Sequence, residues 1–295
     1  MRLTQSKKQS IAQSLREYCV RYQSQNKAAQ SLKHTSSATI SSILNGKWDL
    51  ISDEMWLNLQ AQLTVGNSWQ LYNTSAFDAL NAFLEDAREW SNVVWVVGPA
   101  GIGKSTTAAK YEKEHRNVFV LTCSEDMHKS DFIHELAQKI GVRTGGLTVR
   151  ETLKAIIREI IKMESPLLVF DEGDKLTDSV LYYFISLYNA LEDKCGMVFL
   201  STSYMCERVR KGVATGRKGF DELHSRICRR FVPLDEISLS EVAAICEVNG
   251  LTEREAVKRI LVEAGNCGND LRRVKRLVHR EIRKLAVAQQ TEFKH

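Results

Sequence analysis

Eight consecutive residues, from Gly98 to Ser105, combine glycine, lysine and a hydroxyl at a spacing that can hold phosphate. They read GPAGIGKS, which satisfies the pattern GxxxxGK[ST], and they lie between an apolar stretch and a helical pattern. The glycines let successive backbone N–H groups face phosphate oxygens, and the start of the helix adds positive potential. A chance glycine-rich turn rarely has both neighbours, so we expect this loop to bind the triphosphate of ATP. The expected contacts are Gly98, Pro99, Ala100, Gly101, Ile102, Gly103, Lys104, Ser105 and Thr106.

Two acidic residues at the end of a second apolar stretch could complete a hydrolytic site. Leu167-Leu-Val-Phe leads into Asp171 and Glu172, about 65 residues after the glycine-rich loop. Lys104 would reach the β- and γ-phosphates, and Ser105 and Asp171 would hold Mg²⁺, Asp171 through water. Glu172 is placed to polarise the water that attacks the γ-phosphate. Strands also end in Asp-Glu by accident, but both acids together favour a hydrolase over a nucleotide-controlled switch without chemistry.

Hydroxyls and arginines further along the chain are candidates for contacting the γ-phosphate. The apolar run Met197-Val-Phe-Leu ends in three hydroxyls, of which we choose Thr202, although a plain polar strand end is the alternative. Arg226, Arg229 and Arg230 precede a last predicted strand, and at most one of them is expected to act at a nucleotide. Arg272 lies at the start of a helical pattern.

The elements that must position these residues follow an alternating pattern of helices and strands from Ser75 onward. Wholly apolar runs suit strands that are buried on both faces, and the alternation predicts an α/β fold with a parallel five-stranded sheet. Ser75 and Asp78 resemble a capping box for a helix over 75–90. Strands are predicted over 93–97, 118–122, 167–170, 197–200 and 230–234, and helices over 240–249, 253–264 and 270–287.

These motifs in this order resemble the AAA+ ATPase family over residues 75–287. The resemblance implies that the three C-terminal helices form a lid, that Arg226 is an arginine finger for a neighbouring subunit, and that Arg272 senses the nucleotide from the lid. Thr202 would then be the polar sensor on the fourth strand, where the family most often has Asn. The predicted domains are 1–62, a linker over 63–74, the nucleotide-binding core over 75–235, and the lid with its tail over 236–295.

The N-terminal segment is strongly basic. Residues 1–48 contain eight Lys or Arg and one Glu, a formal charge of +7, although the whole chain carries only +5. Two helical patterns around a turn at 33–36, the second closed by Asn45-Gly46, resemble the helix-turn-helix of phage repressors. We expect DNA contacts from Lys27, Ser37, Thr39, Ser41 and Lys47. A helical bundle for protein contacts is the alternative.

Further basic residues lie between the second and third predicted strands, where AAA+ relatives that form filaments contact DNA. Lys129 is expected in the turn after the second strand, and Arg143 and Arg150 in the loop over 142–150. Residues 208–218 read as another basic loop. Each could equally be solvated charge, but as a set they are compatible with phosphate-backbone binding that weakens steeply with salt.

A repressor-like helix-turn-helix before one AAA+ module resembles the transposition B proteins of phage Mu and related transposon target-selection ATPases. The resemblance implies an ATP-dependent helical oligomer on double-stranded DNA that delivers target DNA to a transposase and is disassembled by hydrolysis. Two alternatives stay open: a replicative helicase loader or replication initiator, and a transcription regulator that uses ATP only as a switch.

Composition excludes several other classes. The seven cysteines form no CxxC pair and the histidines have no metal-binding spacing, so neither a disulfide framework nor a structural metal is expected. No run approaches the roughly 20 apolar residues that cross a bilayer. We expect a cytoplasmic protein, bacterial or phage-encoded, without a membrane partner.

Overall fold

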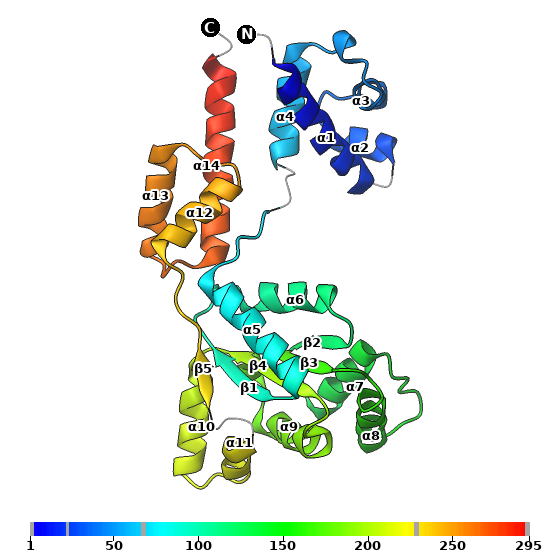
Figure 1. Ribbon diagram of the computed structural model, residues 1–295, viewed down its shortest axis with the longest axis vertical. Coiled ribbons are helices and arrows are strands. Elements are labelled where there is room, and N and C mark those ends of the chain that lie inside the picture. Colours follow the sequence, from blue (N-terminus) through cyan, green and yellow to red (C-terminus); the bar gives the residue numbers. More distant parts are fainter. Residues whose placement is uncertain (1–2, 22–23, 66–68, 227–229, 293–295) are drawn as a thin grey trace. The chain divides into compact units, whose positions relative to one another are not determined.

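The structure is a computed structural model that describes residues 3–21, 24–65, 69–226 and 230–292 (Figure 1). Contacts between Cα atoms divide the chain into two compact units. One unit contains residues 1–71, 245–257 and 275–295, and the other contains 72–244 and 258–274, so the lid helices contribute to both. Within the described residues, no helix is long and apolar enough to cross a membrane.

The second unit is built on a five-stranded parallel sheet in the order β2-β3-β4-β1-β5. The strands are β1 (Val93–Val97), β2 (Val118–Thr122), β3 (Leu167–Asp171), β4 (Gly196–Ser201) and β5 (Phe231–Pro233). All five predicted strands are therefore present, and β3 and β4 are buried at every residue because they lie inside the sheet. The order brings the carboxyl ends of β3, β4 and β1 next to one another.

Helices cover both faces of the sheet (Figure 1). One face packs against α5 (Ser75–Trp90) and α6 (Lys104–Glu114). The other carries α7 (Lys129–Ile140), α8 (Val149–Ile160), α9 (Asp178–Leu191), α10 (Tyr204–Ala214) and α11 (Phe220–Arg226). The aromatic rings of Phe170, Phe184 and Phe199 pack together in the core on this side, with Phe170 and Phe199 stacked and Phe184 edge-on to Phe199.

The helix α5 has the predicted bounds, but its N-cap is one residue before the predicted Ser75. The N-cap is Thr74, whose hydroxyl accepts a hydrogen bond from the N–H of Phe77 at 3.1 Å, and Ser75 is the first helical residue. Thr74 is buried, so its hydroxyl is shielded from competing water. The predicted segment 208–218 is also corrected: residues 204–214 are the helix α10, because Met205 and Val209 supply a buried face that the basic residues Arg208, Arg210 and Lys211 obscure in the sequence.

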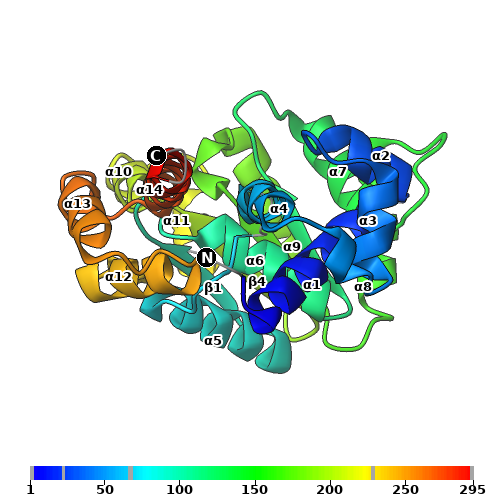
Figure 2. The same cartoon turned by 90° about the horizontal axis from the view of Figure 1, so that it is seen from above.

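The N-terminal helices are α1 (Gln5–Arg21), α2 (Gln25–Ser31), α3 (Ser37–Leu44) and α4 (Asp53–Val65), with a short 3₁₀ turn over Trp48–Leu50. The helix α4 includes the first three residues of the predicted linker. Ile40 and Ile43 of α3 are buried, as the pattern predicted, and pack with Trp56 of α4 and residues of α1. Both views show α2 and α3 side by side (Figures 1 and 2).

The C-terminal helices are α12 (Leu239–Val248), α13 (Arg254–Gly265) and α14 (Leu271–Glu292). Each begins within one residue of its predicted start. The helix α14 extends beyond its predicted end at residue 287, and the sequence up to Glu292 contains no Gly or Pro that would stop it.

Gly196 tests the packing of the sheet. A Cβ at this position would overlap the carbonyl of Ala87 on α5 and contact Leu167 on β3. We expect Gly196→Ala to destabilise the α/β unit by about 2 kcal/mol, the scale of overpacking in a rigid core. Thermal unfolding followed by circular dichroism measures the effect. Gly145→Ala is the matched control, because a Cβ there meets nothing within 4 Å, and equal stability of the two variants would contradict the packing argument.

Candidate nucleotide-binding site

The glycine-rich loop leaves β1 and ends where α6 begins. Gly101 and Gly103 have φ of 79° and 106°, backbone angles that favour glycine, and Gly103 caps α6. The ammonium of Lys104 donates to the carbonyls of Gly98 and Pro99 at 2.6 and 2.9 Å. Burial lowers the pKa of Lys104, while nearby Asp171 and Asp174 raise it. The loop therefore holds a partly desolvated cation beside backbone N–H groups, which suits a phosphate group.

The first turn of α14 contacts this loop. The N–H of Leu271 donates to the carbonyl of Gly101 at 3.0 Å. The carboxylate of Asp270 lies so close to Gly101 that a Cβ there would overlap it, and the same carboxylate accepts from the N–H of Arg272 at 2.7 Å. Two features therefore require glycine at position 101: its positive φ and the closeness of the Asp270 carboxylate. The same contacts link the loop to the start of α14.

Asp171 ends β3 beside the loop. Burial raises the pKa of the Asp171 carboxyl, while a hydrogen bond with the Ser105 side chain, the N–H of Glu172 and the charge of Lys104 act to lower it. The Ser105 hydroxyl and the buried Asp171 carboxylate, which interact with one another, are oxygen donors of the kind that Mg²⁺ prefers, so these two residues fit the predicted ion. Within the described residues, no group of three or more His, Cys, Asp or Glu could hold a metal alone, so phosphate and water oxygens would complete the coordination.

Glu172 follows Asp171 with a left-handed φ of 57°. This conformation turns the chain sharply at the end of β3 into a 3₁₀ turn over Gly173–Lys175. The Glu172 carboxylate forms an ion pair with Lys175 and is half-buried. Its side chain is thus presented at the same edge of the sheet as Asp171, with its charge partly balanced.

The three hydroxyls after β4 have different environments. Ser201 is buried and accepts from the indole N–H of Trp95 at 2.7 Å, so it serves the core. Thr202 is half-buried, and its hydroxyl donates to a carboxylate oxygen of Asp174 at 2.5 Å. Ser203 is exposed at the start of α10. These environments favour Thr202 as the side chain that faces a nucleotide.

Comparison with known proteins decides the class of this unit. Residues 88–207 match the AAA domain family. The matched segment contains the glycine-rich loop, Asp171, Glu172 and Thr202. This segment is an AAA domain. Its identity and the loop geometry together support ATP as the ligand.

The chain also resembles proteins beyond that segment. The Mu-like prophage FluMu DNA transposition protein B of Haemophilus influenzae is 25% identical over 205 residues, which cover 65% of this chain and 70% of that protein. The ATP-dependent target DNA activators B of Escherichia phages D108 and Mu are each 23% identical over 241 residues, or 78% of this chain and 75% of each relative. The predicted resemblance to AAA+ ATPases and to phage Mu transposition protein B is confirmed.

The chain is also similar to solved structures. The crystal structure of NtrX from Brucella abortus in complex with ATP aligns with a TM-score of 0.48 and 10% identity, covering 87% of this chain and 60% of that one.

Two of the candidate arginines, Arg226 and Arg272, lie at the ends of helices. Arg226 is the last residue of α11, exposed, and paired with Glu222 at 3.2 Å in the same helix. Arg230 is exposed before β5, and Arg229 lies outside the described residues. Arg272 is exposed in the first turn of α14 and is close enough to lower the pKa of Lys104. Among the candidate arginines that the structure describes, Arg272 is the one that acts on the Lys104 side chain of the loop.

The AAA-domain candidates for DNA contact lie partly on helices rather than loops. Lys129 is the first residue of α7 and Arg150 the second of α8, because His128 and Thr148 cap these helices earlier than the turn pattern indicates. Arg143 does lie in the connecting loop. All three are exposed, but Lys129 and Arg150 are held by helices and not by flexible loops.

The N-terminal candidates gather around α3. Lys27 on α2 and Lys47 after α3 are exposed, whereas Ser37, Thr39 and Ser41 are half-buried. Ser37 and Ser41 are small residues one turn apart on α3, beside the face that buries Ile40 and Ile43. Thr39 instead bonds the N-cap Ser36 at 2.9 Å, so its hydroxyl is partly engaged.

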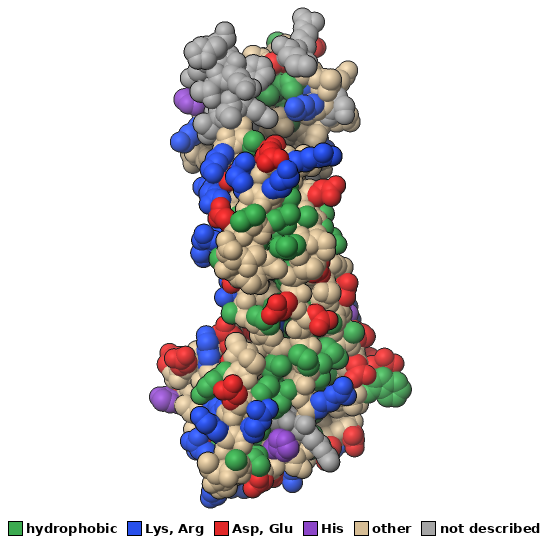
Figure 3. All heavy atoms as spheres, turned by 90° about the vertical axis from the view of Figure 1, so that its left-hand side faces the viewer, with side chains coloured by type: hydrophobic (Ala, Val, Ile, Leu, Met, Phe, Trp, Pro, Cys, Tyr) green, Lys and Arg blue, Asp and Glu red, His purple; other side chains and the backbone are tan. Residues whose placement is uncertain are grey.

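Sequence reasoning missed a second basic surface, on α14. Figure 3 shows Lys and Arg side chains along the side of the molecule that carries the lid helices. Between 271 and 285, the only acidic residue of α14 is Glu281. Its side chain is buried and is paired with Arg280 and Lys284 at 3.2 and 2.9 Å. The exposed basic residues are Arg272, Arg273, Lys275, Arg276, Arg283 and Lys284. The helical period applied to 271–285, instead of the search for loops, would have found this face.

The raised pKa of Asp171 predicts that this residue costs stability. A carboxyl whose pKa is raised by folding binds its proton more tightly in the folded state, so the penalty is absent below the unfolded pKa and grows as pH rises through the folded pKa. We therefore expect nucleotide-free Asp171→Asn to be more stable than wild type at pH 7, with the difference shrinking toward pH 4. Thermal unfolding at several pH values measures it.

Asp126→Asn is the control with the opposite sign. The pKa of the exposed Asp126 is lowered by a hydrogen bond with Ser124, so its contribution is present above the unfolded pKa and lost as pH falls through the folded pKa. Removing that carboxylate should not stabilise the protein at pH 7. A less stable Asp171→Asn protein at pH 7 would refute the burial penalty.

Proposed function

We propose that this AAA domain hydrolyses ATP. The observation that carries the proposal is the meeting of the glycine-rich loop, the Ser105–Asp171 pair and Glu172 at one edge of the sheet. Lys104 would neutralise the β- and γ-phosphates, and Glu172 would orient the attacking water. Mg²⁺, held by Ser105 and Asp171, would supply charge stabilisation for the phosphates when bound.

We further propose that the chain is an ATP-controlled binder of double-stranded DNA that selects target DNA and delivers it to a transposase. Two relatives are named ATP-dependent target DNA activators and one a DNA transposition protein. Their similarity extends over 205 to 241 residues, more than the AAA segment 88–207 can contain. The +7 charge of residues 1–48 and the basic face of α14 suit a polyanionic partner.

The N-terminal helices would serve as a helix-turn-helix. The small side chains of Ser37 and Ser41 on α3 would permit close approach to a groove, and the exposed Lys27 and Lys47 would contact phosphates. Lys129, Arg143 and Arg150 would add phosphate contacts from the AAA domain. The proposed domain limits remain 1–62, 63–74, 75–235 and 236–295, in a protein that acts in the cytoplasm.

Self-assembly would complete the site. Arg226 is exposed at the end of α11 and is not needed by the core of its own domain, so it is available to the nucleotide of a neighbouring subunit. ATP would then hold subunits together on DNA, and hydrolysis would release them. Electron microscopy with an ATP analogue and random duplex DNA separates this function from its rivals, because a helicase loader or an operator-specific regulator need not form long polymers on arbitrary DNA.

Substitutions in the AAA domain test the link between ATP and DNA. Lys104→Ala should abolish ATP-dependent DNA binding, because the phosphates lose their cation. Glu172→Gln should keep ATP and DNA bound while slowing turnover by about 10²-fold or more, the usual scale for a lost general base. Phosphate release and DNA retardation assays measure the two activities. Normal turnover by Glu172→Gln would remove Glu172 from its role, and undiminished ATP-dependent DNA binding by Lys104→Ala would detach the two activities.

Charge removal tests the N-terminal contacts. The double variant Lys27→Gln/Lys47→Gln should weaken DNA binding and reduce the slope of log K against log salt by about 2, since each phosphate contact contributes roughly 0.9. Fluorescence anisotropy over a salt series measures the slope. Lys113→Gln, an exposed lysine on α6 outside the proposed DNA contacts, is the matched control. Equal slopes for both variants would contradict the assignment.

A further inference from the structure

Thr202 gives its only hydroxyl proton to a neighbouring carboxylate. Its Oγ1 donates to Asp174 Oδ2 at 2.5 Å, and its backbone N–H approaches the same oxygen at 3.3 Å. A threonine hydroxyl has one proton to donate, and a phosphate oxygen can only accept. In this conformation Thr202 therefore has no proton for a γ-phosphate.

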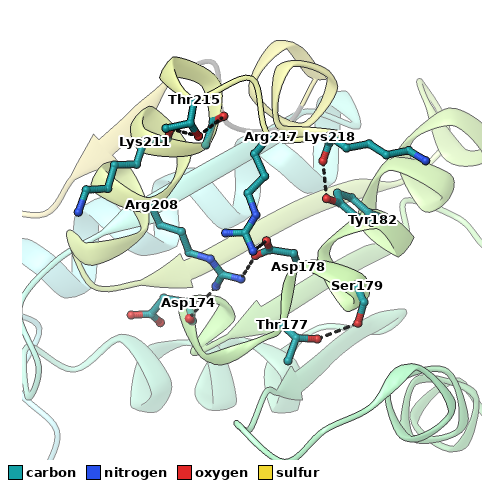
Figure 4. A network of polar contacts seen from close by, with 11 residues as sticks. Asp174, Thr177, Asp178, Ser179, Tyr182, Arg208, Lys211, Thr215, Arg217 and Lys218 are labelled. Atoms are coloured by element: carbon teal, nitrogen blue, oxygen red, sulfur yellow. Dashed lines mark hydrogen bonds and ion pairs between the residues drawn. The ribbon is translucent and has the colours of Figure 1, made fainter.

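Asp174 is held in place by residues outside the phosphate-binding loop. It lies in the 3₁₀ turn over Gly173–Lys175, where its carbonyl accepts from the Arg208 guanidinium at 3.1 Å. Arg208 also forms an ion pair with Asp178 of α9 (Figure 4), and the two side chains are only 14% and 15% exposed. This fixed support leaves the Thr202 hydroxyl as the movable member of the pair.

The support continues toward the end of α11. Asp178 pairs through its other oxygen with Arg217 at 2.6 Å, in the loop between α10 and α11 (Figure 4). In the same loop region, the hydroxyl of Tyr182 on α9 donates to the carbonyl of Lys218. Asp174, which accepts the Thr202 proton, is thus connected through Arg208, Asp178 and Arg217 to the segment that leads to Arg226.

Asp174 is also electrostatically close to the phosphate-binding cation. Its charge raises the pKa of Lys104, and only Asp171 among the carboxylates does so more strongly. The carboxylate is therefore near the place where the terminal phosphate meets Lys104.

We propose that Asp174 is a positioning residue that competes with the γ-phosphate of ATP for the Thr202 hydroxyl proton. Without a γ-phosphate, Thr202 donates to Asp174. With ATP bound, Thr202 rotates, breaks this bond and donates to a γ-phosphate oxygen, which ADP lacks. Asp174 thereby sets how strongly the site prefers ATP over ADP. This inference rests on the proposed function.

The test compares affinities for the nonhydrolysable analogue AMP-PNP and for ADP, both with Mg²⁺, by calorimetry. Thr202→Val should lower the AMP-PNP/ADP preference by about 10-fold, because a hydrogen bond to a charged group is lost. Asp174→Ala should raise the preference by about 3- to 10-fold, because Thr202 no longer breaks a bond to reach phosphate. In the double variant, Asp174→Ala should change nothing beyond Thr202→Val alone.

The double variant separates competition from charge. Removing a negative charge near phosphate would strengthen analogue binding with or without the hydroxyl, so an equal shift in both backgrounds would overturn the proposal. Thr202→Ser keeps the hydroxyl and should behave as wild type. If Asp174→Ala does not fold, Asp174→Asn, whose amide oxygen is a weaker acceptor, should shift the preference in the same direction by less, and no shift would also overturn the proposal. Failure of the wild type to bind AMP-PNP would instead refute the proposed ATPase.

Discussion

The parallel sheet with β4 placed between β3 and β1 is the constraint on which the AAA domain depends. Since all strands run the same way, their carboxyl ends meet at one edge, and residues distant in sequence become neighbours there. The register of the strands pairs Val97 with Ser201 and Phe170 with Phe199. This register fixes the positions of the glycine-rich loop, Asp171 and Thr202 along the strand direction relative to one another. The buried strands leave little freedom for slippage, because a shift of one residue would turn aromatic core side chains outward.

This edge concentrates charge where the protein has little water. Burial disfavours the charged forms of both Lys104 and Asp171, and each partly offsets the cost of the other. A core built for stability alone would use apolar residues here, since a buried ion pair often adds less than the packing it replaces. The retention of these charges is understandable if a phosphate and a divalent cation bind between them. The pKa shifts of Lys104 and Asp171 are therefore consistent with a functional site. They also reflect the free energy that burying these charges costs the fold.

The sequence predicted the elements of the AAA domain better than their arrangement. Apolar runs located the strands, most clearly β3 and β4, because a strand buried on both faces has no polar position to confuse the pattern. The order of the strands could not be read in the same way, since pairing depends on contacts that no local pattern records. Asp174 was missed for a related reason: its importance arises from Thr202, which is 28 residues away in the chain. Arg208 was assigned to a basic loop, although Asp178 and two buried apolar neighbours place it in a helix.

Charge repulsion gives a physical reason to couple nucleotide, assembly and DNA in the proposed function. Subunits that each bring an N-terminal segment of +7 repel one another when they gather without a counter-charge. In the proposed function, DNA phosphates would neutralise that repulsion, and a nucleotide bound between subunits would stabilise their association. By linkage, DNA must then strengthen ATP binding by the same factor as ATP strengthens DNA binding. Loss of the γ-phosphate would return the Thr202 hydroxyl to Asp174 and remove the stabilisation that ATP gives to subunit association. Repulsion between subunits would then again oppose assembly wherever hydrolysis had occurred.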